Sequence, residues 1–356
     1  MLPHSCSTVN TTGSALSVRE CDETDAFQWD QYVQSHPEAT PYHQWGWRHI
    51  FGDAFRQAPR YYGAFVGADL QGILPLVDFR SLLFGHFFVS LPYVNYGGII
   101  GSGAEARRAL LDHVTALAAE LSCTHIELRH VSPQFDDTAV RQHKVAMRLS
   151  LPETSDACWS ALSGKVRNQV RKATKNGLSV RCGGQELLDD FYAVFAVNMR
   201  DLGTPVYGRF CFDAILRTFS DSSAVTVVYA AQRPLAGSVT IRFRDGIEVP
   251  WASSLRLHNH LHANELLYWE MIRSAIEGGL RVFDFGRSTP DAGTFHFKRK
   301  WGAQPTPLAW EYSAVRAHIP DHSPTNAKFT KAIWMWQQLP VSVANMLGPH
   351  IVRHIP

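Results

Sequence analysis

The sequence predicts an α/β protein with mixed sheets, in which one structural unit occurs twice. Two segments, Tyr61 to Phe79 and Val225 to Phe243, each contain two short β-type runs around a turn, a pattern typical of a hairpin. Each hairpin is followed by an apolar segment, a helix and a further strand. Equivalent positions in the two halves lie 157 or 158 residues apart, as Arg129 and Arg287 do. Such a constant offset indicates a tandem duplication.

The helix and the last strand of each unit can be placed from periodicity. In the first unit we expect a helix from about residue 104 to 121 and a strand from His125 to Arg129. In the second unit we expect a helix from about residue 265 to 277, with Asn264 as its N-terminal cap, and a strand from Val282 to Phe285.

The length of 356 residues, 45% of them hydrophobic, allows a sizeable core and suggests two domains. We expect a disordered leader over residues 1–16, a first domain over 17–150, a second over 151–316 and a tail over 317–356. The tail would pack on the second domain or rest on a membrane surface. Its candidate contact residues are Trp334, Trp336, Leu339, Val343 and Met346.

Charge and cysteine usage exclude some classes of protein. A net charge of +2 excludes a globally basic coat for nucleic acid, so we expect no DNA partner, although a local basic patch remains compatible. The N-terminus lacks the basic and apolar regions of a signal peptide, and the apolar run Ser81 to Ile100 is interrupted as buried strands are. The cysteines are dispersed without a C-x-x-C pair, which is typical of a reducing compartment. We therefore expect a cytoplasmic protein. The cysteines are Cys6, Cys21, Cys123, Cys158, Cys182 and Cys211.

A helix predicted from Trp159 to about Asn176 carries basic residues and no acid. Its apolar positions recur every three or four residues, and Gly177 ends it. Uncompensated cations on a helix repel one another, so an anion-binding role and a solvated basic face are both open. The basic residues are Lys165, Arg167, Arg171, Lys172 and Lys175.

A second basic cluster follows a buried strand, in the segment Phe283 to Gly302. Gly286 allows close backbone approach, and Arg287 emerges at the C-terminal end of the strand, where α/β proteins tend to bind ligands. Aromatic residues then alternate with polar ones from Thr294 to Lys300, which predicts an extended segment with one apolar and one cationic face. The pattern fits an anionic ligand, and a hairpin edge protected by lysines is the alternative.

Three further motifs bear on which ligands the protein could bind. Gly101 to Ala106 fits G-x-G-x-x-A, but its counterpart in the second unit lacks the pattern, so an anion seat at a helix N-terminus is favoured over a dinucleotide site. His258, His260 and His262 alternate without a Cys or carboxylate close behind them, so we expect no metal. The chain contains no G-x-S-x-G and no P-loop, so serine hydrolases and P-loop nucleotidases lose support.

Several sequence segments, taken together with the tandem units, identify a protein family more specifically than the hairpins alone. They are SGKVRNQVRKATKNGL from Ser163, NMRDLGTPVYGRFCFDAIL from Asn198, FDFGRS followed by FKRKWG, and a Trp-rich tail with LGP. Together they resemble the FemAB family, which consists of peptidyltransferase-like proteins built from two GNAT (N-acyltransferase) domains. The resemblance covers about residues 17 to 350. It is closest to FemAB-like proteins of the exosortase/PEP-CTERM exopolysaccharide system.

This resemblance implies an acyltransferase that moves an acyl or aminoacyl group onto an amine without a covalent enzyme intermediate. In FemAB proteins the donor is aminoacyl-tRNA and the acceptor is a peptidoglycan precursor. By the same resemblance, Lys298 of F-K-x-x-W-G is a catalytic cation facing the acceptor, and Arg167 or Arg171 binds an acceptor phosphate or carboxylate. The other expected substrate-binding residues are Tyr207, Arg287, Trp251 and Trp301.

Amide formation needs a neutral amine, a fixed acceptor and donors aimed at the developing oxyanion. Backbone N–H groups near Trp251 to Ser253 would be such donors if the strands separate there. Lys298 would stabilise the carbonyl oxygen or lower the pKa of the substrate amine. Asp284 is a candidate base, with a structural hydrogen-bond acceptor as the alternative.

The donor is expected to be a co-substrate, either aminoacyl-tRNA or acyl-CoA, with no bound cofactor. The pyrophosphate loop of GNAT enzymes would fall at Arg256 to Ala263, and the absence of glycine there weakens acetyl-CoA. No inserted coiled-coil hairpin is found, which weakens a peptidoglycan cross-bridge role. We expect the acceptor to be an anionic sugar or peptide precursor of an envelope polysaccharide, reached by peripheral contact at the inner membrane face. A plain acyl-CoA-dependent N-acetyltransferase and a non-catalytic precursor-binding protein are the alternatives.

Overall fold

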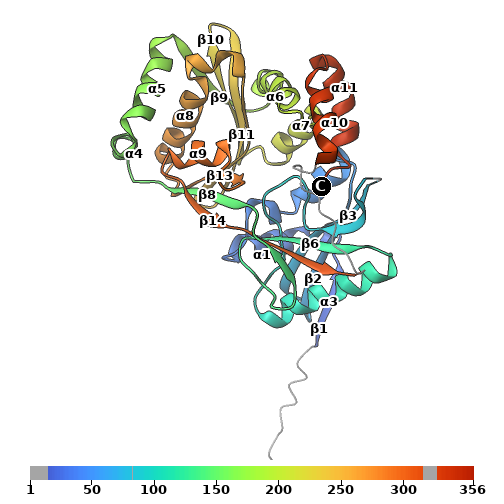
Figure 1. Ribbon diagram of the computed structural model, residues 1–356. Coiled ribbons are helices and arrows are strands. Elements are labelled where there is room, and N and C mark those ends of the chain that lie inside the picture. Colours follow the sequence, from blue (N-terminus) through green and yellow to red (C-terminus); the bar gives the residue numbers. More distant parts are fainter. Residues whose placement is uncertain (1–14, 82, 316–326) are drawn as a thin grey trace, which may run out of the picture.

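The computed structural model describes residues 15–81, 83–315 and 327–356 (Figure 1). Most of the expected leader lies outside the described residues, and strand β1 (Leu16–Glu20) begins at its last position. Part of the expected tail, residues 316–326, also lies outside them, and helices α10 (Ala327–Gln337) and α11 (Val341–Val352) follow. The described residues form a mixed α/β fold with two sheets, as predicted.

The first sheet is formed by β1, β2 (Ala58–Val66), β3 (Asp69–Ser81), β4 (Gly85–Val89), β5 (Ile100–Gly101), β6 (His125–His130), β7 (Ala139–Arg141) and β15 (Ala309–Ala314). The strand order is β1-β2-β3-β4-β6-β15-β7, and β5 pairs with β3. Strands β4 and β6 run parallel, whereas the other neighbours are antiparallel. Helix α3 (Ala104–Glu120) connects β5 to β6 and packs on this sheet.

The second sheet is formed by β8 (Val145–Ser150), β9 (Leu178–Gly183), β10 (Ser223–Ala230), β11 (Arg233–Phe243), β12 (Gly246–Ser254), β13 (Val282–Ser288) and β14 (Gln304–Pro307). Its order is β14-β8-β13-β12-β11-β10-β9, with β12 and β13 parallel. Strands β9 to β13 thus repeat the arrangement of β1 to β4 and β6.

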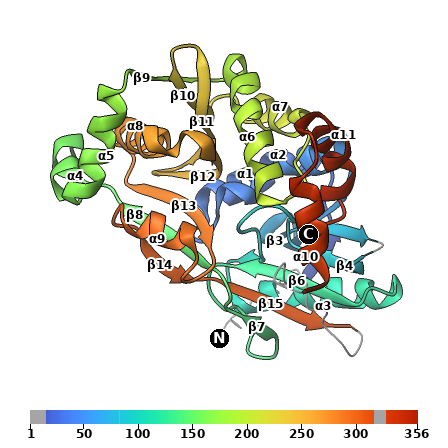
Figure 2. The same ribbon diagram turned by 45° about the horizontal axis from the view of Figure 1, so that its top comes forward.

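The two units exchange one strand each. Strand β8 follows the first unit in sequence but pairs with β13 of the second sheet, where Ser150 lies opposite Val282. Strand β15 follows the second unit but pairs with β6 of the first sheet, where Ala309 lies opposite His130. Figure 2 shows β8 next to β13 in the second sheet and β15 next to β6 in the first. The expected boundary between residues 150 and 151 therefore falls immediately after a strand that belongs to the second sheet.

The remaining helices are α1 (Ala26–Ser35), α2 (Gly46–His49), α4 (Ser155–Ala161), α5 (Gly164–Lys175), α6 (Leu188–Leu202), α7 (Arg209–Thr218), α8 (Ala263–Glu277) and α9 (Gly293–Arg299). Helix α8 packs on the second sheet with α5 beside it, and α6 packs against β11 and β12 (Figure 2). Both predicted hairpins, the two predicted helices of the units and the strands that follow them are confirmed.

Three local predictions are wrong. The helix expected from Trp159 to Asn176 is interrupted after α4, because the Ser163 hydroxyl accepts a hydrogen bond from the Val166 N–H and starts α5 as a separate helix. Asn264 is not the cap of α8: His262 holds that position at a φ of 61°, with no side-chain capping bond. The segment expected to be extended before Lys300 is helix α9, because burial of Phe297 against Tyr268 favours a helical turn over an exposed edge.

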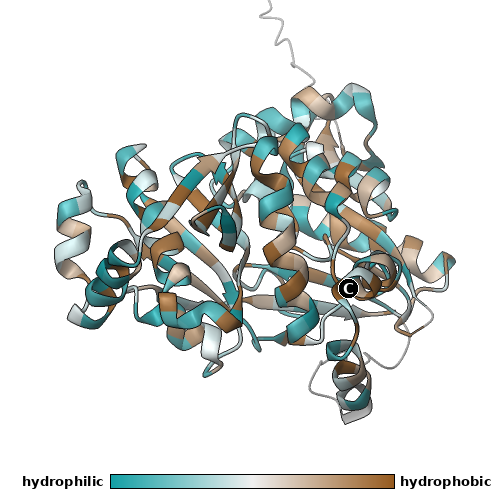
Figure 3. Cartoon of the chain, turned by 90° about the horizontal axis from the view of Figure 1, so that it is seen from above, coloured by the Kyte–Doolittle hydropathy of each residue, from teal (hydrophilic) through white to brown (hydrophobic). Residues whose placement is uncertain are grey.

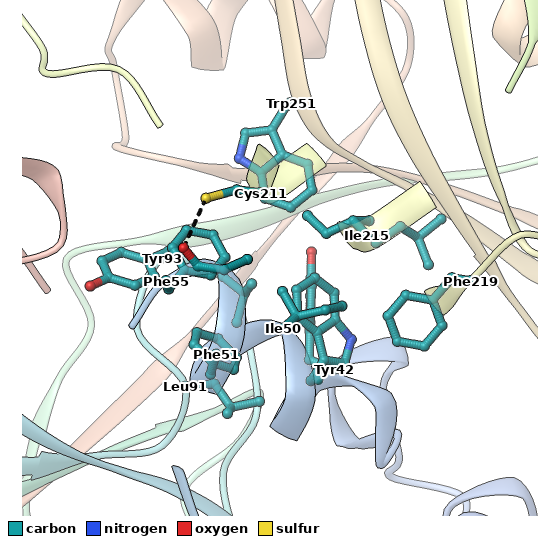
Figure 4. Packing of buried hydrophobic residues seen from close by; sticks show 14 of the residues in the cluster. Tyr42, Ile50, Phe51, Phe55, Leu91, Tyr93, Cys211, Ile215, Phe219 and Trp251 are labelled. Carbon is teal, nitrogen blue, oxygen red and sulfur yellow. Dashed lines mark hydrogen bonds between the residues drawn. The ribbon is translucent and has the colours of Figure 1, made fainter. Parts of the chain in front are cut away.

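The largest apolar cluster joins the two units. In it Phe51 and Phe55 of the first unit pack close to Cys211 and Ile215 of α7, and Cys211 donates to the backbone oxygen of Ala54 (Figure 4). Gly46 of α2 allows the C-terminal end of α7 to come equally close, since a Cβ there would lie 2.5 Å from Thr218 Cγ2. Two further clusters lie within the single units. A continuous core of this kind fixes the units against each other.

Within the described ranges, no helix is both long and apolar enough to cross a bilayer. The same residues contain no group of three or more His, Cys, Asp or Glu side chains placed to hold a metal ion.

Candidate active site

The segment from Ser90 to Gly98, which we call the seam loop, follows β4 and lies between the two units. Leu91 and Tyr93 in it adopt left-handed φ angles of 59° and 69°. The Arg129 Nη1 atom holds this turned backbone by donating to the carbonyl oxygens of Leu91 at 3.3 Å and Val94 at 3.2 Å. The loop can then present its next side chains to the second unit.

Asp284 on β13 receives one of these side chains. Its Oδ2 atom accepts hydrogen bonds from the Tyr96 hydroxyl and from Arg148 Nε, both at 2.9 Å. Its Oδ1 atom accepts from the backbone N–H of Gly286 at 2.8 Å. Only 7% of Asp284 is exposed. Ion pairing with Arg148 makes this residue a well-compensated buried carboxylate.

Glu248 on β12 is a second buried carboxylate, opposite Asp284 in the parallel register. It is 4% exposed, and its Oε1 atom accepts hydrogen bonds from the Tyr42 hydroxyl at 2.8 Å and from Asn95 Nδ2. Both donors are neutral. Burial, and then the neighbouring charge of Asp284, raise the pKa of Glu248 to about 8. Glu248 is therefore poised to exchange a proton near neutral pH.

Beyond this pair the two strands separate. Strands β12 and β13 are paired from Gly246 to Glu248, and the register of β13 against β8 shifts between Asp284 and Arg287. Gly286 lies in this bulge at a φ of 71°, and a Cβ there would lie 2.9 Å from Asn95 Nδ2. The predicted close backbone approach at Gly286 is confirmed. The backbone of Trp251 to Ser253 on β12 is not paired with β13. Its N–H groups are the ones expected from the sequence to stabilise an oxyanion.

Lys298 lies against the same bulge. Its Nζ atom donates to the backbone oxygens of Gly286 at 3.2 Å and Arg287 at 2.8 Å. The residue is 8% exposed, and burial lowers its pKa to about 8, although Asp284 and Glu248 partly offset that effect. Lys298 and the two carboxylates therefore form one electrostatic group, which brings together the two residues predicted as catalytic.

Two cavities open at this seam. One, of about 270 Å³, is lined by Glu248, Asp284, Arg148 and Tyr96, together with Arg244 and neighbouring residues of both units. The other, of about 260 Å³, shares Tyr96 and Arg148 and extends to Arg129. The carboxylate pair is consequently reachable from space between the units, as a catalytic site requires.

The basic helix lies elsewhere. Helix α5 packs on α8 and on β9, at the opposite edge of the second sheet from β8 (Figure 2). Arg171 lies over the Trp159 ring at 5.5 Å, beside a cavity of about 410 Å³. The Nε atom of Arg167 is buried without a hydrogen-bond partner in the described chain. The structure does not bring these arginines together with Lys298, so their anion-binding role stays a prediction.

The other predicted binding residues have different surroundings. Tyr207 packs edge-on against Phe55 and Tyr93, and burial raises its pKa to about 12 while the Arg287 charge opposes that shift. Trp251 is in the interunit core (Figure 4). Trp301 is buried in the core of the second unit. Their predicted contacts with substrate stay predictions.

Several functional candidates were missed from the sequence. Glu248 had a usable signal, since it is an acid inside an apolar strand of the second unit. Tyr42, Asn95, Tyr96 and Arg148 had none, because they lie far from Glu248 and Asp284 in sequence. Tyr42 reaches Glu248 from the 3-10 helix Pro41–His43, Asn95 and Tyr96 belong to the seam loop, and Arg148 belongs to the exchanged strand β8.

Comparison with known proteins assigns a class to this architecture. Residues 161–299 match the family model described as an acetyltransferase (GNAT) domain. This range contains α5 to α9, and so includes Glu248, Asp284 and Lys298. No curated protein sequence matches the chain significantly.

Solved structures extend the likeness to both units. FemX superposes with a TM-score of 0.62 at 14% identity, covering 83% of this chain and 96% of FemX. L-PGS from Bacillus licheniformis gives a TM-score of 0.54 at 12% identity, covering 94% and 98%. A tandem GNAT protein from the clavulanic acid biosynthesis pathway gives 0.51 at 13% identity, covering 86% and 100%. At these identities the likeness is one of fold.

The fold and the family match together define an acyltransferase with two tandem GNAT-like units. The predicted fold class and the predicted enzyme class are confirmed. The chain shares its tandem fold with FemX.

Proposed function

We propose that the protein transfers an activated acyl or aminoacyl group to an amine of a cell-envelope or exopolysaccharide precursor. The observation that carries this proposal is the pair of buried carboxylates beside Lys298 at the edge of a cavity between the units. The fold likeness to FemX and L-PGS supports acyl or aminoacyl transfer. The resemblance to exosortase-associated FemAB-like proteins supports an exopolysaccharide acceptor.

In the proposed reaction, the amine nitrogen attacks the acyl carbon and the bond from that carbon to the donor's oxygen or sulfur breaks. The departing oxygen or sulfur keeps the bonding electron pair and takes up a proton, so the donor leaves as an alcohol or a thiol. Glu248 accepts the proton that the amine loses, because its raised pKa and neutral partners leave it free to do so. Asp284 holds Tyr96 and Arg148 in place rather than serving as the base, since three donors already engage its carboxylate. Lys298 and backbone N–H groups of β12 stabilise the oxyanion.

The donor class is tested by binding. Between β12 and α8, residues Arg256–Leu261 form a 3-10 helix in place of a glycine loop, which supports aminoacyl-tRNA over acyl-CoA. We expect the purified protein to transfer an aminoacyl group from charged tRNA to a precursor fraction, read as a mass increase. Micromolar binding of acetyl-CoA would instead favour the second candidate, an acyl-CoA-dependent N-acetyltransferase, whose support is the description of the matched family.

The C-terminal helices supply a contact surface for a precursor held at a membrane. Trp334 is 61% exposed and Met346 is 63% exposed, whereas Trp336, Leu339 and Val343 are partly buried. Figure 3 shows hydrophobic and hydrophilic residues alternating along the helical segment that leads to the C-terminus. Residues 327–356 contain Lys328, Lys331 and Arg353 and no acid. Exposed apolar side chains beside cations support peripheral binding to anionic lipid. We expect the protein to sediment with phosphatidylglycerol vesicles, and double substitution Trp334→Ser with Met346→Ser to reduce sedimentation. Equal sedimentation of the variant would contradict this contact.

A further inference from the structure

We propose that Arg129, Arg287 and Lys144 form a subsite for an anionic group of the substrate, a carboxylate or a phosphate, beside Lys298. The inference rests on the proposed function for its place in the reaction. Its geometry is independent of that function, because the subsite is built from residues that the duplication and the strand exchange bring together.

The two arginines are equivalent residues of the two units and meet at one point. Arg129 belongs to β6 and Arg287 belongs to β13. Their Nη1 atoms donate to the same carbonyl oxygen, that of Val94, at 3.2 and 3.3 Å. Both guanidinium groups lie over the ring of Trp310, with Cζ at 4.4 Å for Arg129 and 5.3 Å for Arg287. Trp310 belongs to the exchanged strand β15. The pair is therefore fixed by elements of both units.

The charges at this point do not balance. Arg129 Nε donates to Glu127 at 2.8 Å, and both side chains are almost fully buried, so these two charges compensate each other. Arg287 has no carboxylate in contact among the described residues, and its hydrogen bond to Val94 is its one described side-chain bond. Lys144 lies near Arg287, and its Nζ atom donates to the hydroxyl of Thr289 at 2.7 Å. Because this hydroxyl is neutral, it does not compensate the charge of Lys144.

The surroundings disfavour this excess of positive charge. Burial, followed by the charge of Arg129, lowers the pKa of Arg287 to about 10. Burial and the charge of Arg287 also lower the pKa of Lys144. A guanidinium has five N–H donors in a planar fork, and leaving most of them without an acceptor at a partly buried position is costly. An anion that accepts from this fork would remove that cost.

The subsite lies next to Lys298, so it would hold an anionic group of the substrate near the reacting atoms. The Arg287 backbone oxygen accepts a hydrogen bond from Lys298 Nζ, so the subsite adjoins the proposed reaction centre. The Arg287 side chain is partly exposed, so a ligand can reach it. A substrate seated there carries its anionic group close to its reacting amine or acyl carbon. The group is either a carboxylate of an amino acid or acidic sugar, or a phosphate of the precursor's carrier.

The test is calorimetric titration of the full-length protein with inorganic phosphate and, separately, with malonate. We expect one of these anions to bind, and Arg287→Gln to weaken that binding by about tenfold or more. Arg217→Gln removes an exposed arginine of α7 as a matched control and should leave affinity unchanged. Tighter binding of phosphate would indicate a carrier phosphate, and tighter binding of malonate a carboxylate.

A second variant guards against loss of fold. Arg287→Lys keeps the charge and loses the fork, so it should fold and bind more weakly than the wild type. Failure of the wild type to bind either anion, or equal affinity in wild type and Arg287→Gln, would overturn the subsite. Neither result bears on acyl transfer itself, which is measured separately as the mass increase that the wild type gives to the precursor fraction.

Discussion

At the scale of single residues, the active-site candidates differ in how their charges are compensated. Asp284 has a cationic partner in Arg148, whereas Glu248 has hydrogen bonds from a phenol and an amide only. Burial without a cationic hydrogen-bond partner favours the protonated form of a carboxylate, and the pKa of Glu248 is raised accordingly. In the proposed reaction this difference makes Asp284 a positioning residue and Glu248 the base, and it predicts how stability and rate change with pH.

The first prediction concerns stability. The pKa of Glu248 is raised in the folded protein to about 8, so the folded state binds a proton more tightly than the unfolded state does. Between the unfolded pKa of about 4.3 and about 8, raising the pH should therefore lower the stability of the wild type. Glutamine does not titrate, so the stability of Glu248→Gln should not fall for this reason. The unfolding free energy of the variant should therefore rise relative to that of the wild type across this pH interval. Exposed Glu153→Gln should show no such trend, and a flat difference for Glu248→Gln would refute the raised pKa.

The second prediction concerns the rate of transfer. Ionised Glu248 is required as base and protonated Lys298 as cation, and each has a pKa near 8. The rate should rise as Glu248 ionises and fall as Lys298 loses its proton, which gives a narrow optimum near pH 8. Lys298→Met should remove the alkaline fall and lower kcat by about 10²-fold. Arg217→Gln should keep the wild-type profile, and an alkaline fall that persists in Lys298→Met would exclude this role for Lys298.

At the scale of elements, the seam loop and the bulge in β13 build the site between them. Gly286 is the point of closest approach, with its left-handed φ and the Asn95 amide beside it. An alanine there would force either strained backbone or displacement of Asn95 from Glu248.

We therefore expect Gly286→Ala to cost about 1–3 kcal/mol of stability and to reduce transfer. Gly293→Ala at the start of α9 is the matched control, because a Cβ there meets nothing within 4 Å, and it should be close to neutral. Chemical denaturation measures both variants. A Gly286→Ala protein as stable and as active as the control would show that the close approach is dispensable.

The elements also show what the sequence can and cannot predict. Hairpins, helix α8 and the two buried strands depend on local patterns of apolar residues and turns, so they were predicted. Helix α9 was missed because alternating aromatics in a short run fit both a strand and a helix, and burial against Tyr268 decides between them. Glu248 and Asp284 pair across parallel strands with α8 between them in sequence. Their donors Tyr42, Asn95 and Tyr96 come from the first unit, so only the tertiary fold reveals the site.

At the scale of the whole molecule, the exchanged strands make the two units depend on each other. Strand β8 completes the second sheet, β15 completes the first, and a shared apolar cluster joins them. Neither sheet can lose its exchanged strand without disturbing the other unit, which favours one cooperative transition.

We expect hydrogen exchange in increasing urea to report loss of protection at the same midpoint for peptides of β3 and of β11. Far-UV circular dichroism should follow the same curve. Separate midpoints for the two sheets would show that the units unfold independently, contrary to the strand exchange.

The proposed function places acyl transfer at the seam between the two units. The measurement that tests it most directly is mass spectrometry of envelope polysaccharide and lipid-linked precursors from cells that make the wild type, Glu248→Gln, Arg217→Gln or none of this protein. We expect an acyl or aminoacyl mass increment with the wild type and Arg217→Gln that is absent without the protein and strongly reduced with Glu248→Gln. Identical precursor masses in all four strains would contradict it.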